Sequence, residues 1–287
     1  MAIFIVSLLP TSNLLAHGDL HERIASLSRS IKAQPADGNL FLQRGELYRL
    51  HAEPDLAIGD YCRALRLDAT LDLAQLGMAR AWLDMGKPIE ARANLESFLT
   101  KHPRNAEALL VRARILAIQG EARAAAADYT GALGALSRPA PEIFLERAAV
   151  LSNEGLIDEA IAGLDEGVTR LGYIAPLELR AVELELGRQR YDSALARLNG
   201  QIERAPRKEF LLCRRGAILE KAGRLSEAHL AYTAASRELE TLPPAQRANR
   251  ALSDLSDQIL SALERISPRA EEPQSKRKER RISAEAR

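Results

Sequence analysis

The chain has 287 residues, of which 46% are hydrophobic, 28% are charged and only 4% are aromatic, and its formal net charge is +1. Because the positive and negative charges nearly cancel, the protein has no strong overall electrostatic field that would attract nucleic acid or an anionic membrane. The many Ala, Leu, Arg and Glu residues favour helices packed through small side chains. The two cysteines, Cys62 and Cys213, are too few for a disulfide framework. We therefore expect an all-α protein.

Residues 1–16 have the pattern of a secretory signal peptide. An apolar run from Ala2 to Leu9 is followed by the small residue Ala16 just before polar sequence, although the usual positive charge at the start is absent. The run is too short to span a bilayer as a stable helix. We therefore expect a periplasmic or secreted protein, with a cytoplasmic location as the alternative.

The pattern of residues 17–36 predicts a single separate helix near the N-terminus. Asp19 can cap a helix that stops near Pro35. We interpret this segment as an N-terminal capping helix, and its apolar positions at helical spacing are Ile24, Leu27 and Ile31.

His17 and His21 are four residues apart, a spacing at which two histidines on one helix can share a metal ion. His17 precedes the predicted helix start, however, and no third protein ligand is evident. We therefore favour an exposed pair without a metal.

One pattern recurs six times between residues 37 and 242. A small residue is followed four positions later by a bulky one and seven positions later, in most copies, by another small one. The leading alanines are 34, 34, 35, 34 and 34 residues apart. The six triplets are Ala57/Tyr61/Ala64, Ala91/Leu95/Phe98, Ala125/Tyr129/Ala132, Ala160/Leu164/Gly167, Ala194/Leu198/Gln201 and Ala228/Tyr232/Ala235.

This spacing predicts a helical hairpin. Positions i, i+4 and i+7 share one helix face, and a glycine between two helical stretches ends the first where a left-handed residue is needed. Each unit is therefore a helix A, a tight turn and a helix B, and neighbouring units must stack to bury their second faces. The glycines that we assign to the turns are Gly86, Gly120, Gly155 and Gly223.

The repeats resemble the tetratricopeptide repeat family over residues 38–242. In repeat 1 the signature positions of the family fall on Phe41, Gly45, Tyr48, Ala57, Tyr61 and Ala64. The resemblance implies a right-handed α-solenoid of stacked antiparallel helix pairs, with six repeats over residues 37–242 and capping helices at both ends. Repeat 5 departs from the pattern, with Val182 and Gln201 at small positions and Gly187 out of register.

Two segments follow the repeats. Residues 243–266 predict a terminal solvating helix, and residues 267–287 form a basic tail that we interpret as disordered. From Pro268 on, seven basic residues stand against four acidic ones. Binding of nucleic acid or another anionic partner by this tail is an alternative function. The predicted apolar stripe of the solvating helix is Leu252, Leu255, Ile259, Leu260 and Leu263.

The sequence contains no P-loop, dinucleotide-binding, H-E-x-x-H or CxxC motif. We therefore expect no cofactor, no metal and no small-molecule substrate. An enzyme whose active site lies in a groove without a recognisable motif is the alternative, although the histidines are scattered: His17, His21, His51, His102 and His229.

Four repeats carry an arginine just before the first small position, a row that suggests an anion-binding track. Asp60 and Asp128 occupy the matching helix B position only in repeats that have this arginine. We therefore favour ion pairs within the hairpins, Arg44 with Asp60 and Arg112 with Asp128. The four arginines are Arg44, Arg112, Arg147 and Arg215.

The resemblance implies a partner on the concave wall that the A helices line. The fifth position of the repeat is apolar in every copy, and the ninth and twelfth positions add charge. We expect a peptide segment to dock on this stripe, with packing between neighbouring A helices as an equal alternative. The candidates are Leu42, Leu76, Leu110, Leu145, Leu179 and Cys213 at the fifth position, with Glu46, Arg49, Arg80, Arg114, Glu183 and Glu220 beside them.

Two special functions of the family are not expected. Relatives that clamp a C-terminal carboxylate carry Lys and Asn where this chain has Leu42 and Glu46, and RNA-reading relatives carry polar residues at the fifth position. We expect a non-enzymatic protein-interaction scaffold in a bacterial cell envelope. Docking on the stripe requires Leu76 and Leu110 to keep exposed apolar area, with Arg80 and Arg114 available to orient the ligand.

Overall fold

The computed structural model describes residues 11–247 and 249–266, and within these ranges every regular element is a helix. Helix α1 (Thr11–Ala33) is followed by twelve helices in the alternating A and B order of the predicted repeats. The all-α prediction is confirmed. The helices are α2 (Gly38–Leu50), α3 (Pro54–Leu67), α4 (Leu73–Asp84), α5 (Pro88–Lys101), α6 (Ala106–Ile118), α7 (Ala122–Ala135), α8 (Pro141–Asn153), α9 (Ile157–Leu171), α10 (Ala175–Gly187), α11 (Tyr191–Arg204), α12 (Glu209–Lys221) and α13 (Leu225–Glu240), and then α14 (Pro244–Arg247) and α15 (Arg250–Ile266).

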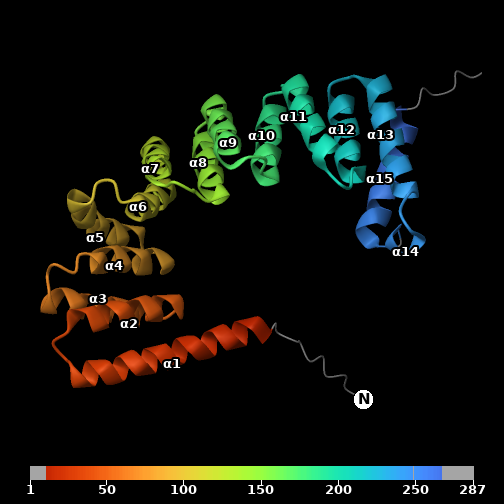
Figure 1. The fold of residues 1–287 in the computed structure, drawn as a ribbon. Coiled ribbons are helices and arrows are strands. Elements are labelled where there is room, and N and C mark those ends of the chain that lie inside the picture. Colours follow the sequence, from red (N-terminus) through yellow and green to blue (C-terminus); the bar gives the residue numbers. More distant parts are fainter. Residues whose placement is uncertain (1–10, 248, 267–287) are drawn as a thin grey trace, which may run out of the picture. The chain divides into compact units, whose positions relative to one another are not determined.

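The described residues form two units, which divide between residues 160 and 161. In the first unit α1 packs on α2, each B helix packs on its A helix, and the A helices α2, α4 and α6 follow one another (Figure 1). In the second unit α10 pairs with α11 and α12 pairs with α13, and α15 covers α12 and α13. Both units are built from the same helix-pair geometry.

The recurring triplet forms the core of each hairpin. Ala57, Tyr61 and Ala64 are fully buried, and the corresponding residues of the other repeats are buried as well. A Cβ atom built on Gly45 would lie 2.8 Å from Cε1 of Tyr61, and one built on Gly77 would lie 2.5 Å from Cζ of the same ring. Tyr61 is therefore held between the A helix of its own repeat and that of the next, which explains why both facing positions are glycine.

The turns between A and B helices use left-handed backbone, as predicted. Gly86, Gly120, Gly155 and Gly223 have φ values between 69° and 78°. Repeats 1 and 5 lack this glycine, but the same position keeps a positive φ, with Ala52 at 61° and Gln189 at 58°. The turn conformation is therefore imposed by the hairpin even where the residue type disfavours it.

The two ends differ in detail from the prediction. Helix α1 begins at Thr11 and passes through Gly18, so a helix start at Asp19 was wrong. One glycine costs a helix about 1 kcal/mol relative to alanine, and the helix formers Leu14, Leu15 and Ala16 precede it. Residues 1–10, most of the predicted signal segment, lie outside the described residues, as does the predicted basic tail of residues 267–287.

Helix α15 covers the end of the second unit as the stripe predicts, with one correction. Leu252, Leu255 and Ile259 are buried, whereas Leu260 is 53% exposed. Neighbouring residues on a helix point about 100° apart, so Ile259 and Leu260 cannot both face the core. Across the described ranges, each helix is too short or too polar to cross a bilayer.

Candidate functional site

The two predicted ion pairs within the hairpins are confirmed. Nε and Nη2 of Arg44 lie 2.7 and 2.8 Å from the two carboxylate oxygens of Asp60, and the corresponding distances from Arg112 to Asp128 are 2.6 and 2.8 Å. These hydrogen bonds raise the pKa of both guanidinium groups. Arg147 is also buried, and its Nη1 donates to Oγ1 of Thr130. Three of the four arginines of the row therefore make contacts inside the fold, which argues against an open anion track.

A second set of ion pairs links successive A helices of the first unit. Nη1 of Arg80 lies 2.7 Å from Oε1 of Glu107, and Arg114 forms two hydrogen bonds of 2.9 and 3.0 Å with Glu146. Arg80 and Arg114, which we expected to orient a ligand, therefore already have carboxylate partners, and the Arg114 side chain remains 46% exposed. Spacing within one repeat does not indicate these partners, because they lie on the neighbouring repeat. Arg49 likewise reaches Asp84, at 3.4 Å.

The apolar stripe is not uniformly exposed. Leu76 is only 3% exposed, so the expectation that it keeps exposed apolar area was wrong, and Cys213 is equally buried. The neighbouring A helices enclose these side chains, as the packing alternative supposed. Leu110 is half-buried against the core that contains Leu109. The other fifth-position leucines, Leu42, Leu145 and Leu179, are half-buried.

A pocket of about 660 Å³ brings part of the stripe together in the first unit. It lies among α1, α2 and α4, and it includes Leu42, Glu46, Leu76 and Arg80 from the candidates. Arg49, Leu110, Arg114 and Leu145 lie outside its lining, while Leu179 and Glu183 belong to the second unit. The remaining lining residues are Arg23, Ser26, Leu27, Gln43, Leu47, Leu50, Leu73, Gly77 and Glu107.

The most exposed apolar side chains of this pocket were missed by the sequence analysis. Leu50 is 57% exposed and Leu73 is 54% exposed. Leu50 lies eight positions after Leu42 on α2, and Leu73 lies three positions before Leu76 on α4, so each shares a helix face with a predicted candidate. Helical periodicity extended from the fifth position would have found both. On the α1 wall of the pocket, Leu27 is one of the apolar positions that helical spacing had already indicated for this helix.

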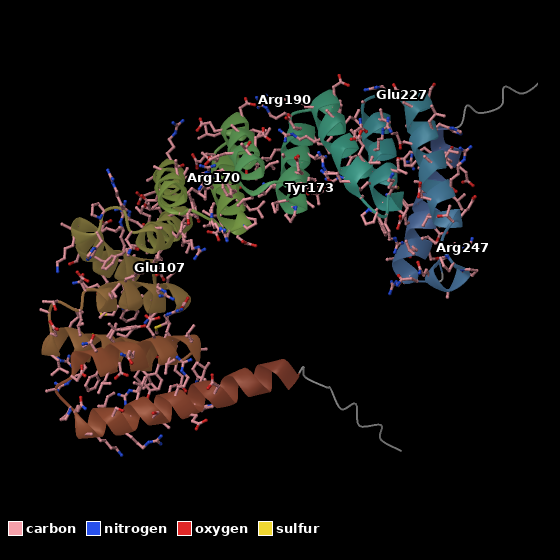
Figure 2. All side chains as sticks on the ribbon, in the orientation of Figure 1. Glu107, Arg170, Tyr173, Arg190, Glu227 and Arg247 are labelled. Carbon is pink, nitrogen blue, oxygen red and sulfur yellow. The ribbon has the colours of Figure 1, made fainter. Side chains whose placement is uncertain are left out.

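The charged groups at the pocket edge differ in whether they already have partners. Glu46 accepts a hydrogen bond of 2.6 Å from the hydroxyl of Tyr61, and its other oxygen lies 3.5 Å from Nη1 of Arg80. Burial and the contact with Glu46 raise the pKa of the Tyr61 phenol, so it remains a donor. Arg80 is shared with Glu107, which is labelled in Figure 2. Arg23 is exposed and places a positive charge on the α1 edge of the same pocket.

No protein-family model and no curated protein sequence matches the chain. Solved structures do match it. The C-terminal part of a TPR repeat-containing protein from Cytophaga hutchinsonii superposes with a TM-score of 0.63 at 13% identity, covering 85% of this chain and 97% of the other. A tetratricopeptide repeat protein from Parabacteroides merdae gives a TM-score of 0.53 at 17% identity, covering 87% and 95%. The chain has the tetratricopeptide repeat fold.

The tetratricopeptide repeat fold also relates this chain to a subunit of a larger assembly. In the APC/C hetero-tetramer Cut9–Hcn1, the matched chain superposes with a TM-score of 0.52 at 17% identity over 72% of this chain and 40% of that one. Within this fold the pocket lies on the A helices α2 and α4 and is closed on one side by α1.

Proposed function

We propose that the first unit is a non-enzymatic docking module that binds a protein segment in the pocket among α1, α2 and α4. The observation that carries this proposal is the combination of an apolar lining with two leucines that remain more than half exposed at its edge. Solved structures with this fold include chains in the protein complexes Cut9–Hcn1 and Naa15/Naa10, which supports a protein partner.

The apolar lining sets the main requirement on the partner. Leu50 and Leu73 contact solvent now, and covering them removes that apolar area from water. Complete burial of a leucine contributes about 1.5–3 kcal/mol, so covering a half-exposed one contributes roughly 1 kcal/mol. The segment that binds therefore presents two or more apolar side chains, at a spacing that reaches Leu50 on α2 and Leu73 on α4.

The charges set a second requirement. Arg80 already has Glu46 and Glu107 as partners, so this edge gains little from a charged ligand. Arg23 on α1, by contrast, is exposed and places a positive charge beside the apolar surface. A carboxylate next to the apolar residues of the ligand complements Arg23, chiefly by increasing the association rate. We therefore infer an acidic and apolar peptide segment as the ligand.

A displayed library of random peptides, selected against the full chain, tests this function. Peptides with paired apolar residues and an acidic residue are expected to be enriched. The double substitution Leu50→Ser and Leu73→Ser removes roughly 2 kcal/mol of binding, which is about a 30-fold weaker affinity. The protein should remain folded, because both side chains are largely outside the core.

Leu56→Ser is the matched control, since Leu56 is 51% exposed in the same unit and lies outside the pocket lining. It should leave affinity unchanged. Arg23→Glu should weaken binding of the acidic peptides and reduce its dependence on salt. Selected peptides that bind the double variant as tightly as the original chain would contradict the proposal, and so would a selection without enrichment.

We also propose that the protein is exported, on the signal-peptide pattern of residues 1–16. Terminal sequencing of the protein from a fractionated native host should give a mature chain that begins at or near His17. Full-length protein confined to the cytosol would exclude export.

A further inference from the structure

Two histidines from different helices meet at the junction of α1 with the first repeat. Nε2 of His21 on α1 lies 3.1 Å from Nε2 of His51, which follows the last residue of α2. The ring centroids are 4.2 Å apart, and the rings are inclined at 67°. Along the sequence the histidine near His21 is His17, four residues earlier. The contact of His21 with His51 joins residues 30 positions apart, so spacing alone did not indicate it.

The second nitrogen of the His51 ring also has a partner. Nδ1 of His51 lies 3.2 Å from Oε1 of Glu53. This contact lacks hydrogen-bond geometry, but the nearby carboxylate favours the tautomer with the proton on Nδ1, in which Nε2, the nitrogen that faces His21, keeps its lone pair. A carboxylate behind a histidine is the usual support of a metal-binding imidazole, because it fixes the tautomer and the ring orientation.

The separation of the two nitrogen atoms suits a shared metal ion. Zinc–nitrogen bonds of about 2.0–2.1 Å at a tetrahedral angle place two ligand nitrogens about 3.3 Å apart. The observed separation of 3.1 Å is close to this value. His21 is exposed, so water can fill the remaining coordination positions.

We propose that His21 and His51 bind one divalent transition-metal ion, Zn²⁺ or Ni²⁺, through their Nε2 atoms, with Glu53 as a supporting residue. Among the described residues no three His, Cys, Asp or Glu side chains converge as a metal cage, so this is an open site with two protein ligands from that part of the chain. The ion joins α1 to the end of α2 and limits the motion of α1. This inference does not depend on the proposed peptide binding.

Titration of the untagged, metal-free chain with Zn²⁺ or Ni²⁺ in a calorimeter tests the site. We expect one ion per chain, and at least a tenfold loss of affinity for His21→Ala and for His51→Ala. Glu53→Gln should weaken binding by about tenfold, as loss of a supporting carboxylate does in other sites. His229→Ala, a change of an exposed histidine in the second unit, is the matched control and should leave the affinity unchanged.

Hydrogen exchange adds a readout that depends on where the ion binds. Zn²⁺ should slow amide exchange along α1 in the original chain, and this protection should disappear in His21→Ala. Equal affinity of the original chain and the two histidine variants would overturn the proposal. Binding without added protection of α1 would also overturn it, because an ion shared by His21 and His51 must connect α1 to α2.

Discussion

The left-handed turn residue of repeat 5 provides a direct test of how the hairpin imposes its geometry. Gln189 has φ 58°, its side chain is exposed, and its backbone N–H donates to the carbonyl of Leu186. An L-residue in this conformation costs about 1–2 kcal/mol, a cost that glycine avoids. Glycine also gains freedom in the unfolded chain, which offsets about 0.4–1 kcal/mol. Gln189→Gly should therefore stabilise the protein by roughly 0.5–1 kcal/mol.

Ala52→Gly should have the same sign, because Ala52 occupies the same turn position with φ 61°. The reverse change is the matched control. A Cβ at Gly86 or at Gly120 would meet no atom within 4 Å, so Gly86→Ala and Gly120→Ala introduce only the conformational cost. Both should destabilise by a similar amount. Urea unfolding followed by circular dichroism measures the four variants, and hydrogen exchange at each turn shows whether the change is local.

The reasoning fails if Gln189→Gly and Ala52→Gly lower the free energy of unfolding as the alanine variants do. That result would mean that the side chains of Gln189 and Ala52 contribute more than the backbone strain that they carry.

Two further predictions concern packing. Gly77→Ala should destabilise the first unit by roughly 1–3 kcal/mol, because the new Cβ would lie 2.5 Å from the buried Tyr61 ring. Gly59→Ala on α3 has open space around the new Cβ and should be stabilising. Equal effects of the two substitutions on the free energy of unfolding in urea would contradict this reasoning. Burial raises the pKa of the Cys213 thiol, so in the folded protein at pH 8 a thiol reagent should modify the partly exposed Cys62 well before Cys213, and equal rates would refute the buried position of Cys213.

The sequence by itself determined the repeat and most of its internal geometry. The triplet around Tyr61 and the turn glycines such as Gly86 follow from spacing within one helix or one turn. The pairs Arg44–Asp60 and Arg112–Asp128 were also predictable, because a hairpin of fixed length brings residues 16 positions apart to the same place. These features depend on the local backbone, whose periodicity can be read along the chain.

The tertiary structure decided which of these residues remain available to a partner. Leu76 and Leu50 are both leucines on A-helix faces, yet stacking buries the first and leaves the second more than half exposed. Stacking also pairs Arg80 with Glu107 and brings His21 to His51, contacts across 27 and 30 residues. No local spacing encodes such contacts, because they depend on how closely one helix pair settles on the next. The tight fit of Gly45 and Gly77 against Tyr61 sets that distance.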